Sequence, residues 1–191
     1  MEKKDLKPAG VFKYFEEICQ VPRPSKKEEK MIAYLKAFGA KHNLETKVDE
    51  AGNVLIKKPA TPGKENLQTV VLQSHIDMLC EKNNDVQHDF LTDPIETEID
   101  GEWLKAKGTT LGADNGIGVA TELAILGDDS IEHGPLECLF TVDEETGLTG
   151  AFALQEGFMS GDILLNLDSE DEGEIFIGCA GGIDSVAEFT Y

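Results

Sequence analysis

Residues 69–77 of the sequence, TVVLQSHID, join a short apolar run to a histidine and an aspartate. The run over 69–72 is typical of a buried strand. His75 and Asp77 come next, and a spacing of two residues on an extended segment points both side chains to the same face. A neutral imidazole can bind a metal ion through one nitrogen while a carboxylate orients the ring through the other. Taken alone, however, this pair favours a structural role, with Asp77 as a cap at the strand end.

Strands and helices alternate along the rest of the chain. Apolar residues at helical spacing predict a helix over 11–18, which Pro8 can start, and another over 31–38 behind a capping box of Ser25 and Glu28. This alternation favours an α/β layer architecture. The other predicted elements are a hairpin over 44–48 and 53–57, a long loop over 80–108 with a short strand near Trp103, a helix over 115–126, strands over 136–142, 162–167, 175–177 and 185–191, and a short helix over 151–155.

The candidate functional side chains lie next to the ends of these predicted elements. His75, the pair Glu144 and Glu145, and Asp168 each follow a predicted buried strand, and Asp114 precedes a predicted helix. In open α/β sheets, ligand sites gather outside the carboxyl ends of the strands. We therefore expect four separate segments to deliver polar groups to one crevice.

Asp114 stands in the run Gly112-Ala113-Asp114-Asn115-Gly116. An aspartate before a helix is a preferred N-cap, which is the structural interpretation. The glycines around it cost helix stability but permit the close approach of backbone or ligand. This composition favours a functional role, in which the two oxygens of one carboxylate could bridge two cations.

Glu144 and Glu145 follow Asp143 at the end of an apolar strand. Three successive carboxylates repel one another unless solvent or a cation relieves them. One interpretation is a solvated acidic turn before Gly147. The functional interpretation gives one glutamate to a metal ion and its neighbour to proton transfer, because a base must lie close to the water it activates.

Asp168 closes the apolar run over 163–167, so it is a further candidate ligand. The acidic run over 169–174 is expected to be a solvated loop, and His42, His88 and His133 are expected to be structural. One histidine and three carboxylates, with a further ligand, suit a pair of zinc ions. Calcium would prefer an all-oxygen shell, whereas manganese or cobalt could replace zinc.

The composition limits the classes of partner. The 191 residues correspond to one domain, and a net charge of −20 disfavours binding to nucleic acid or to anionic membranes. We expect no signal peptide and no membrane span, since the N-terminus is charged and no apolar run is long enough. The four widely spaced cysteines are typical of free thiols in an intracellular protein, so we expect a cytoplasmic location.

Four motifs together give a more specific indication. SHIDMLCEK (74–82), GTTLGADNGIG (108–118), DEETGLTGA (143–151) and NLDSED (166–171) closely resemble the aminoacyl-histidine dipeptidases, also called cytosol non-specific dipeptidases or peptidase D. The resemblance extends from the N-terminal helix to the GCAGG segment at 178–182. It implies a di-zinc exopeptidase-like catalytic domain with a mixed sheet flanked by helices, and dipeptide substrates that include Xaa-His.

The resemblance also implies a role for each candidate residue. Asp77 would orient His75, and Glu144 would take a proton from the attacking water and pass it to the leaving amine. Asp114 would bridge the two zinc ions. His75 and Asp168 would bind the first zinc ion, and Glu145 would bind the second.

The chain departs from the family in its length. Family members are more than twice as long and carry a lid or dimerisation domain, followed by the rest of the catalytic domain with the last histidine ligand. No histidine follows His133 here. We therefore expect residues 1–191 to be the N-terminal portion of the catalytic domain, nearly inactive alone, within a full-length parent that is a homodimer.

Two alternatives remain open. The first is another hydrolase of the same superfamily, such as an aminoacylase, deacetylase or carboxypeptidase. The length between His75 and Asp114 and the wording of GTTLGADNGIG favour the dipeptidases over these enzymes. The second is a non-catalytic, acidic metal-binding or interaction module that keeps the fold without turning over substrate.

Overall fold

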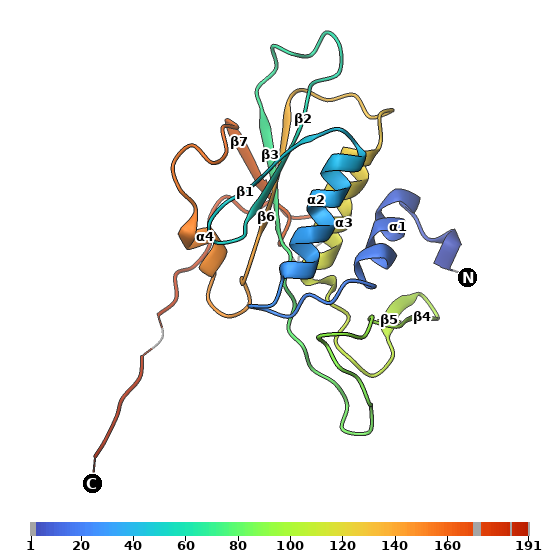
Figure 1. Ribbon diagram of the computed structural model, residues 1–191, viewed down its shortest axis with the longest axis vertical. Helices are drawn as coiled ribbons and strands as arrows, with labels where there is room; N and C mark the ends of the chain where they lie inside the picture. Colours follow the sequence, from blue (N-terminus) through green and yellow to red (C-terminus); the bar gives the residue numbers. More distant parts are fainter. Residues whose placement is uncertain (1–2, 170–172, 184, 191) are drawn as a thin grey trace.

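A computed structural model describes residues 3–169, 173–183 and 185–190. It contains one mixed five-stranded sheet, a separate two-stranded hairpin and a set of helices (Figure 1). The elements are η1 (Lys3–Asp5), α1 (Ala9–Ile18), α2 (Glu29–Lys41), β1 (Glu45–Val48), β2 (Val54–Lys58), β3 (Val70–His75), β4 (Thr97–Asp100), β5 (Trp103–Ala106), α3 (Ala113–Gly127), β6 (Leu136–Thr141), α4 (Thr149–Ala153) and β7 (Ile163–Asn166).

The strands of the large sheet run in the order β1-β2-β6-β3-β7. β3 lies between β6 and β7 and is parallel to both, whereas β2 is antiparallel to β6 and to β1. The predicted hairpin is the β1–β2 pair. The predicted α/β architecture with a mixed sheet flanked by helices is thereby confirmed.

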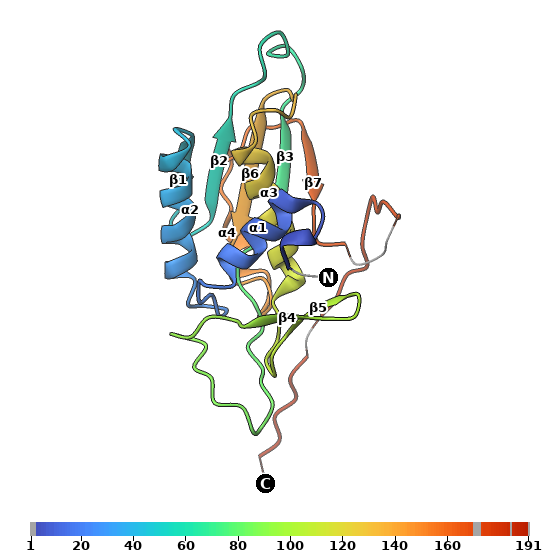
Figure 2. The same ribbon diagram turned by 90° about the vertical axis from the view of Figure 1, so that its right-hand side faces the viewer.

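The three long helices cover one face of this sheet. α1, α2 and α3 lie together on that face, and α4 lies on the other (Figures 1 and 2). Phe15, Leu35 and Leu123, one from each long helix, are buried against Phe140 of β6 in the main core. A smaller cluster on the opposite face contains Leu55, Val71 and Leu139. Because β3 is covered on both sides, its end is held firmly beneath the long helices.

The start of α3 is irregular. Gly112 has a left-handed backbone with φ 67°, and Asp114 and Asn115 have non-helical dihedral angles. The peptide bond between Asp114 and Asn115 is cis. Because these two residues have non-helical dihedral angles, the regular helix begins after Asn115, close to the predicted start at residue 115, and Asp114 lies on a turn and not in a helical cap.

The predicted capping box at the start of α2 is wrong. Ser25 Oγ donates to Asp77 Oδ2 at 2.8 Å, and Glu28 Oε1 accepts the backbone N–H groups of Lys26 (2.9 Å) and Asp143 (3.0 Å). The first residues of α2 are exposed, so water can satisfy their N–H groups. Asp77 and Asp143 are buried and have no such alternative, so they form hydrogen bonds with the side chains of Ser25 and Glu28.

Two predicted strands near the end of the chain are also wrong. Residues 175–177 and 185–190 form no strand, and residue 191 lies outside the described residues. Ile175 and Ile177 are almost completely exposed. An alternating apolar pattern becomes a strand only when a partner satisfies its backbone groups, and no described segment pairs with either stretch.

The segment over 80–108 is a long loop, as predicted, but it contains a complete hairpin. β4 and β5 pair antiparallel, with Asp100 opposite Trp103. The short helix α4 begins two residues before its predicted start. Within the described part of the chain, no helix combines the length and the apolar character that a membrane crossing requires.

Candidate metal centre

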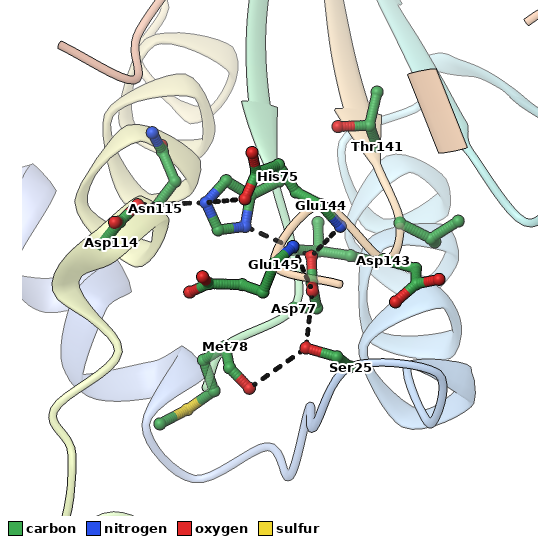
Figure 3. Close-up of polar contacts among 12 residues, drawn as sticks. Ser25, His75, Asp77, Met78, Asp114, Asn115, Thr141, Asp143, Glu144 and Glu145 are labelled. Carbon is green, nitrogen blue, oxygen red and sulfur yellow. Dashed lines mark hydrogen bonds and ion pairs between the residues drawn. The ribbon is translucent and has the colours of Figure 1, made fainter. Parts of the chain in front are cut away.

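The candidate residues meet at one edge of the sheet. β3, β6 and β7 are parallel, so their carboxyl ends lie side by side. His75 is the last residue of β3, Asp168 follows β7, and Glu144 follows β6. Asp114 reaches the same place from the irregular start of α3 (Figure 3). The expected meeting of four segments is confirmed in the structure.

His75 lies at the centre of this group and is 1% exposed. Its Nδ1 is 3.2 Å from Asp77 Oδ1, and its Nε2 is 3.0 Å from Asp114 Oδ1. The carboxylates of Asp168 and Glu144 also approach Nε2, at 3.8 and 3.9 Å. One ring nitrogen is therefore held by Asp77, and the other faces three carboxylates.

Asp77 is completely buried and joins several parts of the site. Besides His75 and Ser25, it accepts the backbone N–H groups of Glu144 at 3.0 Å and Glu145 at 3.3 Å (Figure 3). Burial would raise the pKa of Asp77, but the hydrogen bonds from His75, Glu144 and Ser25 outweigh it and lower that pKa. Asp77 is therefore a carboxylate acceptor that fixes both the imidazole and the glutamate turn.

Asp143 points away from the other two carboxylates of the acidic turn. Its backbone has φ 49°, and its side chain accepts the hydroxyl groups of Thr146 (2.6 Å) and Thr149 (2.5 Å). Glu28 accepts its N–H from the opposite side. This arrangement relieves the repulsion expected among three successive carboxylates and leaves Glu144 and Glu145 directed to the site.

Asn115 also belongs to the candidate site, although the sequence pattern did not single it out. Its Nδ2 donates to Asp168 Oδ1 at 2.5 Å and to the carbonyl of Leu167 at 3.1 Å. It thereby ties the end of β7 to the turn that carries Asp114. The available signal was its position, because Asn115 directly follows the candidate ligand Asp114 and both lie between Gly112 and Gly116.

Burial and the charges of the site shift the pKa values of its ionisable groups. Burial lowers the pKa of His75, but the hydrogen bonds to Asp77 and Asp114 and the charge of Asp168 outweigh it and raise that pKa to about 9. Burial raises the pKa of Glu144, against the charge of His75 and with the charge of Asp168. Burial likewise raises the pKa of Glu145. Carboxylates crowded in this way create a negative potential that a bound cation would relieve.

The donor set fits a divalent metal ion. His75, Asp114 and Asp168 each offer a ligand atom, and these atoms lie within 4.8 Å of one another. One imidazole nitrogen with carboxylate oxygens is a typical zinc donor set. The carboxylate of Glu145 lies apart from this group, and its Oε1 accepts the N–H of Leu79 at 3.4 Å. The structure thus groups three of the four predicted ligands, whereas Glu145 is outside that group.

The other histidines have structural surroundings, as expected. His42 stacks on Phe38, and His88 packs edge-on against Phe90. His133 Nδ1 lies 2.7 Å from the carbonyl of Gly134. Glu170, Asp171 and Glu172 of the predicted acidic loop lie outside the described residues.

Comparison with known proteins points to one family. The model of the peptidase family M20/M25/M40 matches residues 71–187. The chain is 53% identical over 183 residues to the cytosol non-specific dipeptidase of Escherichia coli (strain K12), a match that covers 96% of this chain and 38% of that protein. The resemblance inferred from the four motifs is therefore confirmed.

Solved structures give the same result. The aminoacylhistidine dipeptidase from Vibrio alginolyticus is 55% identical with a TM-score of 0.91, covering 94% of this chain and 36% of that one. An aminopeptidase from Bacillus cereus is 26% identical with a TM-score of 0.71, covering 85% of this chain and 43% of that one. This chain spans less than half the length of each of these relatives. Since the family model covers more than half of its residues, the chain belongs to the peptidase family M20/M25/M40.

Proposed function

We propose that this chain is part of a metallo-dipeptidase that hydrolyses dipeptides, Xaa-His among them. The 53% identity to a cytosol non-specific dipeptidase and the likeness to an aminoacylhistidine dipeptidase support the substrate class. The convergence of Asp114, Asp168 and Glu144 on one nitrogen of His75 is the single observation that carries the proposal.

Two zinc ions are the proposed cofactors. His75 and Asp168 would hold the first ion, Asp114 would bridge the pair, and Glu145 would contribute to the second. Zinc bound there would polarise the peptide carbonyl and stabilise the negative charge that develops on its oxygen. Manganese or cobalt could occupy the same donors.

Glu144 is the proposed general base. It would accept a proton from the attacking water and deliver it to the leaving amine. Three features of Glu144 support this role: its N–H is fixed by Asp77, its Oε2 lies 3.9 Å from His75 Nε2, and burial raises its pKa. A carboxylate with a raised pKa is a better proton acceptor, and later a better donor, near neutral pH.

Residues 1–191 are proposed to be the N-terminal portion of the catalytic domain, with the lid or dimerisation domain and the remaining catalytic portion supplied by the rest of a longer, homodimeric, cytoplasmic protein. The chain covers 38% of its dipeptidase relative and has no histidine after His133. The second ion then lacks a nitrogen ligand, and the substrate lacks positioning groups. Positioning supplies a large part of catalysis, so the 191-residue chain alone should be nearly inactive.

Dipeptide hydrolysis with added zinc tests this proposal. A full-length protein carrying this segment should cleave Xaa-His dipeptides, and its Glu144→Gln variant should keep its zinc but lose activity. Unchanged hydrolysis by the variant would remove Glu144 as the base. Zinc binding without any hydrolysis by the unaltered full-length protein would favour the non-catalytic metal-binding module.

A further inference from the structure

The only arginine of the sequence lies buried behind the candidate metal centre. Of the 17 Lys and Arg residues, all except Arg23 are lysines. Arg23 is 2% exposed. Taking a charged group out of water is costly unless hydrogen bonds compensate it. The contacts of Arg23 therefore indicate what its position achieves.

The guanidinium joins the two segments that carry the central histidine and the bridging carboxylate. Nη1 donates to the carbonyls of Ile76 and Asp77, both at 3.1 Å, and Nη2 donates to the carbonyl of Gly112 at 2.5 Å. Ile76 and Asp77 directly follow His75, and Gly112 lies two residues before Asp114. The planar fork of one side chain thus spans both segments, which a single point donor cannot do in the same way.

Two glycines leave the space that this group occupies. A Cβ atom at Gly112 or at Gly116 would lie 2.6 Å from Arg23 Nη2. Gly112 also has the left-handed backbone that favours glycine. The glycines around Asp114 are therefore accounted for by the arginine packed against the turn.

The hydrogen bonds of Arg23 end on backbone carbonyls. Among the described residues, no carboxylate forms an ion pair with it, although the charges of Asp77 and Asp114 act on it through space. Asp77 is free to hold His75, and the carboxylate of Asp114 stays directed to the site. The backbone of Arg23 is fixed as well, since its carbonyl accepts the N–H of Met78 at 3.1 Å.

We propose that Arg23 is a positioning residue that holds the His75–Asp77 segment and the Asp114 turn at a fixed separation and thereby sets the affinity of the centre for a divalent cation. The inference rests on the part of the proposed function that assigns a metal ion to His75, Asp114 and Asp168. It adds a requirement on the backbone behind these ligands.

The sign of one measurement separates this role from a purely electrostatic one. A fixed positive charge near the site repels a cation, so removing the charge alone would strengthen metal binding. Removing the clamp would let the two segments separate and would weaken it. Loss of groups that orient metal ligands commonly costs about 10- to 100-fold in metal affinity.

The test compares the 191-residue chain with three variants. Arg23→Met removes the donors and the charge, and Arg23→Lys keeps the charge without the fork. Lys58→Met is the matched control, because Lys58 is also buried and donates to the carbonyls of Ile125 and Asp128, at the far end of α3. Zinc affinity is measured by competition with a chromophoric chelator, and the ligand field by the visible spectrum of bound Co²⁺.

The positioning role predicts a loss of zinc affinity of about 10- to 100-fold in Arg23→Met, a smaller loss in Arg23→Lys, and an altered Co²⁺ spectrum in both. Lys58→Met should lower thermal stability and leave the zinc affinity and the spectrum unchanged.

Equal or tighter zinc binding by Arg23→Met would overturn the inference, as would an equal loss in Lys58→Met. If Arg23→Met does not fold, wild-type affinity and spectrum in Arg23→Lys would overturn it. If the unaltered chain binds neither Zn²⁺ nor Co²⁺, the proposed metal centre itself fails and the inference with it. That outcome is recognisable before any variant is made.

Discussion

Asp77 Oδ1 lies 3.2 Å from Nδ1 of His75, and this contact leaves Nε2 of the ring directed at Asp114. A carboxylate can only accept, so the proton of the neutral imidazole resides on Nδ1 and the lone pair on Nε2. The same carboxylate holds the N–H groups of Glu144 and Glu145. One buried group thus sets the geometry of the proposed ligand and of the proposed base.

The first prediction concerns Asp77→Asn. The amide cannot accept all four hydrogen bonds as a carboxylate does, so we expect zinc affinity to fall by about 10- to 100-fold. Isothermal titration with Zn²⁺ measures this change. Asp49→Asn is the matched control, because Asp49 accepts the N–H groups of Ala51, Gly52 and Asn53 in the β1–β2 turn, and no hydrogen bond among the described residues joins it to His75, Asp114 or Asp168. Equal zinc affinity in the two variants would contradict the role of Asp77.

The second prediction concerns protons released on metal binding. The pKa of His75 is raised to about 9 in the metal-free chain, against its burial, by the carboxylates of Asp77, Asp114 and Asp168. The raised pKa stabilises the metal-free fold below pH 6.5, and this contribution is lost as the pH rises through about 9.

A metal ion requires the neutral ring, so zinc should displace about one proton at pH 7.5, and its affinity should increase with pH up to about 9. Titration calorimetry in buffers of different ionisation enthalpy counts the proton. Zinc binding without proton release would show that His75 is not a ligand.

The third prediction concerns Glu122, which lies in α3 with its carboxyl group completely buried. Ser74 and Cys138 lie beside it, but neither oxygen has a hydrogen-bond partner among the described residues. Burial raises the pKa of Glu122 well above its usual range. The contribution of Glu122 to stability is therefore fully present below the pKa that this group has in the unfolded chain. It is lost as the pH rises through the pKa of the group in the folded chain.

The Glu122→Gln variant should therefore melt at a higher temperature than the unaltered chain at pH 8, and at a similar temperature near pH 4. Glu137→Gln is a control of opposite sign. Despite burial, the pKa of Glu137 is lowered by Lys57 and Ser160, so that variant should be less stable at pH 8. Thermal unfolding by circular dichroism checks both. A lower melting temperature for Glu122→Gln at pH 8 would contradict the assignment.

The sequence predicts the edge of the sheet well because its signals there are local. Apolar runs over 69–72 and 163–167 become β3 and β7, and the polar residues after them, His75 and Asp168, come within 3.8 Å of each other. The parallel direction of β3 and β7 is the one that α/β alternation favours, so the meeting of His75 and Asp168 needed no distant contact to be anticipated.

The sequence fails where two segments compete for one side chain. Ser25 has the spacing of a cap, yet it donates to Asp77, which lies 52 residues away. Asp143 is acidic like the two residues that follow it. Its carboxylate, however, accepts hydrogen bonds from Thr146 and Thr149 and points away from theirs. Such choices depend on burial and on partners that only the folded chain provides.

The strand patterns at 175–177 and 185–190 fail for a related reason. The alternation is present, but no described strand pairs with these residues. Local pattern sets which face a strand would bury, whereas pairing decides whether the strand forms.

The proposed function requires a metal ion bound by His75, Asp114 and Asp168. Anomalous diffraction at the zinc absorption edge, from crystals of the chain grown with Zn²⁺, tests this directly. We expect an anomalous peak within coordination distance of His75 Nε2 and of the carboxylates of Asp114 and Asp168. A zinc-loaded crystal with no peak there, or with its peak on other residues, would contradict it.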